Sequence, residues 1–150
     1  ALLASENDIK SFSKTGQRRD LNREKFKLEK LSAVFKNPES NANKNLRYLR
    51  KAMDVRAKLP QFHPQSNMEC LSKGRSDIVV IKRGIGSKSI FTIHNMTENK
   101  INYRFIDYEF TKLIKKDVNM QDYLTSNKYN SNNIELEPFQ VIWLGFLIND

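Results

Sequence analysis

Apolar residues recur at helical spacing in two stretches of the first sixty residues. The pattern predicts a helix over residues 23–36, with Asn22 or Asp20 as its N-cap. A second helix is predicted over residues 41–58, with Ser40 as its N-cap. The apolar stripes are Leu28, Leu31, Val34 and Phe35 in the first helix and Leu46, Leu49 and Met53 in the second. Stripes of this kind usually pack in a core, so we expect both to be buried.

From about residue 60 the apolar period changes from 3.6 to 2, and two prolines mark the change. Short antiparallel strands are predicted over residues 67–71, 77–83, 89–95, 100–107, 134–137 and 141–148. Hairpin turns are predicted at Gly84–Ser87 and at Thr97–Asn99, and a surface loop at residues 126–133. Tyr103, Phe105 and Trp143 are expected to face inward. The sequence therefore predicts an α+β chain, helical over residues 1–62 and all-β over residues 63–150.

Length and composition restrict the class of protein. With 150 residues and 39% hydrophobic content, the chain can bury a core. No apolar run approaches 18 residues and the N-terminus lacks the layout of a signal peptide, so we expect neither a membrane span nor export. The chain starts Ala1-Leu2-Leu3 rather than with methionine. We expect it to be a piece of a longer protein.

The single cysteine, Cys70, excludes an internal disulfide, and a reducing, cytoplasmic setting is the expectation. Cys70 is expected to be a small buried residue. The positions of His63 and His94 match no metal-ligand spacing, so no metal is expected.

The net charge of +9 is regional. Residues 1–60 hold 15 Lys and Arg against 7 Asp and Glu, whereas residues 61–150 hold 11 against 10. The basic part has few aromatic residues and no groove-reading motif, so we expect no nucleic-acid partner. A positive field also suits an enzyme that takes up phosphate.

The densest cluster of charges is the stretch Thr15-Gly16-Gln17-Arg18-Arg19-Asp20-Leu21-Asn22-Arg23. A guanidinium is a planar fork of donors that can grip a phosphate or adjacent hydroxyls, and a neighbouring carboxylate can fix its orientation. Taken alone, most basic runs are simply solvated surface.

Together with Asn7-Asp8 upstream, this stretch resembles a signature of the sucrose phosphorylase group in glycoside hydrolase family 13, which reads N-D, a spacer, then T-G-x-x-R-D-[IL]-N-R. Three later stretches resemble segments of the same group in the same order. They are Arg56 to Pro64, which is similar to R-x4-A-F-H-P with Gln61 in place of the usual small residue, Ile93 to Thr97, and Glu137 to Leu144.

The resemblance implies a fold and a reaction. Residues 1–62 would be the last βα loop and helices of a catalytic (β/α)8 barrel, and residues 63–150 an antiparallel β-sandwich. The implied enzyme is a retaining phosphorylase that cleaves sucrose, sucrose 6'-phosphate or glucosylglycerate with phosphate to give α-glucose 1-phosphate. Inorganic phosphate is the co-substrate and no cofactor is implied.

The resemblance also implies roles for individual residues. Arg19 would contact the bound sugar, while Asp20, Asn22 and Arg23 would fix the loop. Asn7 and Asp8 would line the same pocket. The nucleophile and the acid/base would lie upstream, so no catalytic residue is expected in this chain and the fragment is expected to be inactive alone.

Three other interpretations remain open. The enzyme could be a family 13 α-glucoside hydrolase or transglucosylase, which would form glucose in place of glucose 1-phosphate. The chain could be a basic nucleic-acid-binding module, with salt-dependent affinity. The β domain could also be a carbohydrate-binding platform, for which exposed coplanar aromatic residues would be expected.

Overall fold

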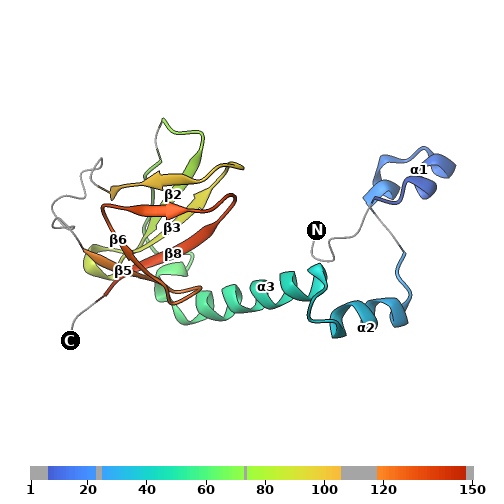
Figure 1. Cartoon of the computed structure of the whole chain (residues 1–150), viewed down its shortest axis with the longest axis horizontal. Helices are drawn as coiled ribbons and strands as arrows, with labels where there is room; N and C mark the ends of the chain where they lie inside the picture. The colour runs from blue at the N-terminus through green and yellow to red at the C-terminus, as the bar shows by residue number, and fades with distance from the viewer. Residues whose placement is uncertain (1–6, 23–24, 73, 106–117, 148–150) are drawn as a thin grey trace. The chain divides into compact units, whose positions relative to one another are not determined.

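The computed structural model describes residues 7–22, 25–72, 74–105 and 118–147 (Figure 1). The chain divides into two compact units, Ala1–Met53 and Asp54–Asp150. The division falls inside a helix, so the end of that helix belongs to the second unit. The boundary predicted at residue 62 separates the end of an implied barrel from the β domain. The division into two compact units does not test it, so it stays a prediction.

The helical unit contains more structure than the periodicity predicts. Its elements are α1 (Ile9–Thr15), η1 (Arg18–Asn22), α2 (Leu28–Lys36) and the greater part of α3 (Asn41–Lys58). The motif stretch, which the resemblance places in the last βα loop, contains the short helices α1 and η1. The expected cap of α2 is wrong, since α2 begins at Leu28 and its N-cap position, Lys27, makes no side-chain cap bond.

Helix α3 is where the sequence predicts it. The Ser40 hydroxyl accepts a hydrogen bond from the Asn43 N–H at 3.1 Å, which confirms the predicted cap. The expected burial of its apolar stripe is wrong in this chain, because Leu49 and Met53 are 45% and 61% exposed. Further large apolar side chains of this unit are exposed in the same way: Ile9, Leu28 and Tyr48. No helix among the described residues is long and apolar enough to cross a membrane.

The second unit is an antiparallel β-sandwich (Figure 1). A six-stranded sheet has the order β1-β2-β3-β8-β5-β6, and β4 pairs with β7 in a second sheet. The strands are β1 (Met68–Cys70), β2 (Ile78–Arg83), β3 (Ile90–Asn95), β4 (Ile101–Tyr103), β5 (Asn119–Asp122), β6 (Lys128–Asn130), β7 (Ile134–Leu136) and β8 (Val141–Phe146). The predicted α+β class is confirmed.

One hydrophobic core lies between the two sheets. Alternate residues of the larger sheet meet those of the smaller sheet, as the period of two requires. The fully buried members of the core include Ile78, Val80, Phe91, Ile93, Tyr103, Met120, Ile134, Leu136, Ile142 and Leu144. Phe105 packs edge-on against Phe91 at a centroid distance of 4.8 Å. Tyr103 and Phe105 therefore face inward as predicted, whereas Trp143 is half-buried.

Two buried polar side chains hold the connections of the sandwich. The Asp122 carboxylate is fully buried and accepts hydrogen bonds from the backbone N–H groups of Leu124, Trp143 and Thr125 and from the Thr125 hydroxyl. The Asn95 amide is 2% exposed and donates to the carbonyls of Asn99 and Glu137 at 2.7 and 2.9 Å.

Three local predictions are wrong. The turn at Thr97–Asn99 is no hairpin, because β3 before it and β4 after it belong to different sheets. The predicted loop at 126–133 contains β6, which pairs with β5. Cys70 is exposed rather than buried, because it lies on β1 at the edge of the larger sheet. The apolar residues 1–4, which by the resemblance would be the exit of the eighth barrel strand, lie outside the described part of the chain.

A cluster around Phe62 joins the short helix η2 (Pro60–Phe62) to the sandwich. The Phe62 ring packs on Trp143 at a centroid distance of 4.7 Å, and the Arg83 guanidinium lies 5.8 Å from its centroid. Arg83 also donates to the Gln61 carbonyl at 2.8 Å. The Gln61 amide donates to the Lys88 carbonyl at 2.7 Å. The Gln61 Cγ lies so close to Gly84 that a Cβ at position 84 would be 2.9 Å from it.

Candidate functional site

The two halves of the Asn7-Asp8 and Thr15-to-Arg23 motif fold into one local unit. Asp8 is the N-cap of α1, and its carboxylate accepts from the Ser11 N–H at 2.9 Å and the Ser11 hydroxyl at 2.7 Å. The Asp8 N–H donates to the Leu21 carbonyl at 2.7 Å. The start of α1 is thereby tied to η1, thirteen residues later in the sequence.

The Thr15-Gly16 pair forms the turn between α1 and η1. Gly16 has φ +65°, the left-handed conformation in which a glycine ends a helix at little cost, and its N–H donates to the Phe12 carbonyl. The Thr15 hydroxyl then donates to the Asp20 carboxylate at 2.6 Å. A threonine, a glycine and an aspartate at this spacing therefore close the loop on itself.

Arg19 lies on η1 and its side chain is exposed. Within the described residues no ion pair joins it to Asp20, whose carboxylate instead accepts from Thr15. Asn7 is exposed too, next to the half-buried Asp8. The loop thus brings Asp8, Asp20 and the Arg19 backbone into one fold without using the guanidinium. Arg23, expected to complete the motif, lies outside the described residues.

Local hydrogen bonds stabilise the negative charge of the Asp8 carboxylate. The hydroxyl and backbone N–H of Ser11 lower the pKa of Asp8 below its ordinary value, so this carboxylate is ionised at neutral pH. In the β unit, burial lowers the pKa of His94, which favours the neutral imidazole. His63 is exposed.

The two carboxylates of the loop have structural partners. Asp8 and Asp20 are both engaged in holding the loop, and a retaining glycosidase needs a nucleophile and an acid/base about 5 Å apart on either side of a sugar. Among the described residues, no group of three or more His, Cys, Asp and Glu could hold a metal ion. The arrangement is suited to binding, through an exposed guanidinium on a braced loop.

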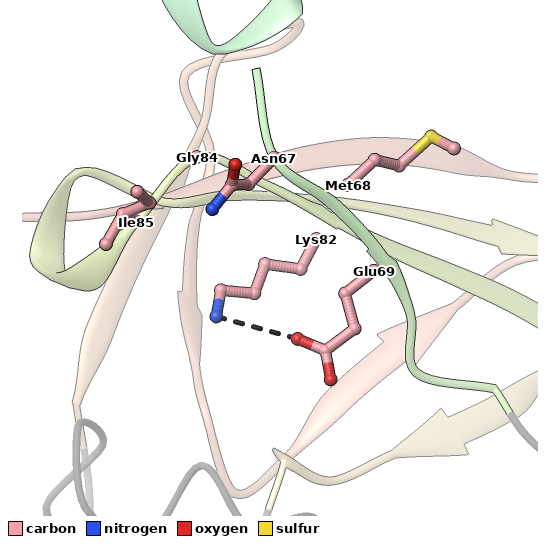
Figure 2. A pocket seen from close by; sticks show the side chains of 6 residues that line it. All are labelled: Asn67, Met68, Glu69, Lys82, Gly84 and Ile85. Atoms are coloured by element: carbon pink, nitrogen blue, oxygen red, sulfur yellow. Dashed lines mark ion pairs between the residues drawn. The ribbon is translucent and has the colours of Figure 1, made fainter. Parts of the chain in front are cut away.

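The β unit carries an open hollow that the sequence analysis missed. It has a volume of about 450 Å³ and is lined by Asn67, Met68, Glu69, Lys82, Gly84 and Ile85 (Figure 2). Glu69 and Lys82 face each other across β1 and β2, with Oε2 and Nζ 3.7 Å apart. The sequence shows only that two neighbouring strands carry opposite charges. That these charges lie opposite each other follows only from the register of the two strands.

No protein-family model matches this chain, and no curated protein sequence matches it. Solved structures do match. AmyP in complex with maltose, and a variant of AmyP in complex with maltotriose, give TM-scores of 0.55 and 0.57 at 13% and 15% identity. The match to the maltotriose complex covers 72% of this chain and 22% of the other.

Two further neighbours bear names of sugar-active enzymes. A variant of the trehalulose synthase MutB in complex with its substrate sucrose has a TM-score of 0.54 at 11% identity, over 75% of this chain and 19% of that one. An Anoxybacillus α-amylase has a TM-score of 0.53 at 17% identity, over 76% and 25%. The chain spans about a fifth to a quarter of the length of these proteins. At such identities the likeness establishes a common fold, and it confirms the predicted fold class.

Proposed function

We propose that the chain is the C-terminal part of a glycoside hydrolase family 13 enzyme that acts on an α-glucoside. Its structural neighbours include an α-amylase and a trehalulose synthase complexed with sucrose, which supports this class. An upstream barrel would supply the nucleophile and the acid/base. The exposed apolar residues of the helical unit support the proposal, because the outer helices of such a barrel need a sheet to pack against.

Within this class we propose a sugar phosphorylase. The observation that carries the proposal is the closed loop formed by the motif, in which Asp8 bonds Leu21 and Thr15 bonds Asp20. These bonds brace the backbone from which Arg19 projects. At the mouth of the barrel, the guanidinium would then contact the bound glucosyl group and the incoming phosphate, with no cofactor.

The proposed reaction has two displacements. The upstream carboxylate attacks the anomeric carbon of the donor and the aglycone leaves with a proton from the acid/base. Phosphate then attacks the anomeric carbon of the glucosyl-enzyme, its proton passes to the acid/base, and the enzyme carboxylate leaves, so that α-glucose 1-phosphate is released. Phosphate has to outcompete water, and fixed guanidinium donors favour the anion by orienting it and compensating its charge.

The test is an assay of the full-length protein with sucrose, with and without phosphate. We expect glucose 1-phosphate only when phosphate is present. Release of glucose or of an isomerised disaccharide at the same rate in both reactions would instead favour the hydrolase or transglucosylase alternative. No turnover of sucrose, sucrose 6'-phosphate or glucosylglycerate, with or without phosphate, would contradict the phosphorylase.

The role of Arg19 is tested by comparison with its neighbour on η1. Arg19→Lys keeps the charge and loses the fork, so we expect kcat/KM to fall by roughly 10². Arg18→Lys is the matched control, since Arg18 is an exposed arginine in the same turn, and it should remain within about threefold. Equal effects of the two substitutions would contradict a specific contact at Arg19.

A further inference from the structure

The segment that joins α3 to the first strand, residues 59–66, has the composition of a linker but the structure of a closed turn. It contains two prolines and two glutamines, and proline-rich segments commonly connect domains that move independently. Here the His63 N–H and the Ser66 hydroxyl both donate to the Pro60 carbonyl, at 3.0 and 2.9 Å. The segment folds back on itself instead of extending between α3 and the sheet.

Arg83 on β2 binds this turn from the side of the sheet. Its Nε donates to the Gln61 carbonyl at 2.8 Å and its Nη2 to the His63 carbonyl at 2.9 Å. Its Nη1 donates to the Met68 Sδ at 3.5 Å. A guanidinium is planar and rigid, so the direction of one donor fixes the direction of the others. One side chain therefore sets both the position and the orientation of the turn.

The Phe62 ring joins the end of α3 to the same place. The Phe62 side chain is 7% exposed and packs on Trp143 of β8. The Arg56 guanidinium, from the last turn of α3, lies 5.5 Å from the centroid of this ring. Cation–π contacts of this kind are attractive, and more so where water is excluded. Groups from the helix, the turn and two strands thus meet on one aromatic ring.

Gln61 provides an attachment that does not involve Arg83. Its side-chain amide donates to the Lys88 carbonyl, in the short helix η3 (Gly86–Lys88) of the β2–β3 connection. The turn is therefore bonded to the β unit from two directions, by Arg83 from β2 and by Gln61 toward η3. A segment held on two sides has little freedom to rotate as a hinge.

We propose that the end of α3, from Asp54 onward, forms one rigid body with the β sandwich, and that Arg83 is the side chain on which this rigidity depends. The two prolines shape the turn and do not act as a hinge. The proposal concerns only the unit Asp54–Asp150, and it does not depend on which reaction the whole protein catalyses.

NMR of the 150-residue chain in a weakly aligning medium measures the rigidity. We expect the residual dipolar couplings of the amides of residues 54–63 and of the strands to fit a single alignment tensor. Order parameters of the Gln61 and His63 amides should be about 0.85, as in rigid backbone. In Arg83→Lys, which keeps the charge but loses the fork, they should fall to about 0.6, and the couplings of residues 54–58 should leave the common fit.

Arg104→Lys is the matched control, because Arg104 is an exposed arginine of the same unit, just after β4, and its replacement should change neither readout. A second tensor for residues 54–58 in the unmodified chain would overturn the rigid body. A single tensor with unchanged order parameters in Arg83→Lys would overturn the role of Arg83. If that variant does not fold, Phe62→Leu gives the same test, because it removes the ring that Arg83, Arg56 and Trp143 share, and unchanged readouts there would equally overturn the proposal.

Discussion

The two units of this chain differ in the burial of their apolar residues. In the β unit, Phe91, Ile142 and Leu144 are fully buried between two sheets. In the helical unit, Leu28 is 78% exposed and Met53 61% exposed, although both lie in helices with a regular apolar stripe. The β unit therefore completes its own core, whereas the helical unit leaves large apolar side chains exposed, which an upstream barrel would cover if the proposed function is right. A periodic apolar stripe predicts which face of a helix is buried, but it does not predict which surface covers that face.

The largest expected effect concerns the buried carboxylate of the β unit. Asp122→Ala removes the acceptor for three backbone N–H groups and one hydroxyl, and leaves donors buried without partners. We expect a loss of about 3–5 kcal/mol in the free energy of unfolding. Urea denaturation followed by tryptophan fluorescence measures it at Trp143. Asp122→Asn, which keeps one acceptor, should lose less, and equal losses would contradict the hydrogen-bond explanation.

Two substitutions to alanine, one in each unit, test the difference in burial between the units. Ile142→Ala opens a cavity in a closed core and should cost about 2–5 kcal/mol. Leu49→Ala removes an exposed side chain, 45% accessible, and should cost less than about 0.5 kcal/mol in this chain. Both are measured by urea denaturation. In the full-length protein, where we expect another surface to bury Leu49, Leu49→Ala should lower the free energy of unfolding by more than about 1 kcal/mol. An equal small cost in both contexts would contradict a covering surface.

The third effect concerns the connection between the two sheets. Asn95→Ala removes two donated bonds, to Asn99 and Glu137, and two accepted from Thr97. We expect a loss of about 2–3 kcal/mol. Asn99→Ala is the matched control, because Asn99 is exposed and takes part through its backbone, and it should change stability by less than about 0.5 kcal/mol.

The smallest effect is the response to pH, which should differ between the units. Burial lowers the pKa of His94 from its ordinary 6.5, so the unfolded chain binds a proton first as the pH falls. Stability of the β unit should drop from near pH 6.5 down to the folded pKa, by at most about 1.4 kcal/mol per pH unit. Urea midpoints between pH 8 and 5 measure this drop. His94→Gln should abolish it.

The helical unit should respond only at lower pH. Hydrogen bonds from Ser11 lower the pKa of Asp8 from 3.8, so its contribution is complete above that value and is lost as the pH falls through the folded pKa. The helical circular dichroism signal should therefore be constant between pH 8 and 5. A loss of helix near pH 6 would contradict this assignment.

Much of the fold could be predicted because its signals are local. The Ser40 cap and the strand periods depend only on neighbouring residues, and they were confirmed. Helix α1 was missed because it has only seven residues and no regular apolar stripe, although Asp8 before it and Gly16 after it are ordinary helix boundaries. The N-D and T-G pairs were assigned to a binding motif, and their structural role as caps was overlooked.

The rest depends on contacts distant in sequence. No periodicity relates Glu69 to Lys82, and only the register of β1 and β2 places them opposite each other. The β6 strand was missed because its residues are polar and its partner β5 determines it. The roles of Asn7, Asp8, Arg19 and Asp20 toward a sugar stay predictions.

The contact between Gln61 and Gly84 has a consequence for sequence variation. A methyl group at position 84 would meet the Gln61 side chain at 2.9 Å, and the Gly84 φ of +87° adds strain to any replacement. The Gln61 side chain thus fills the space that a side chain at position 84 would need. We expect the two positions to change as a pair among related proteins, with a small residue at 61 tolerating more bulk at 84 than this chain can.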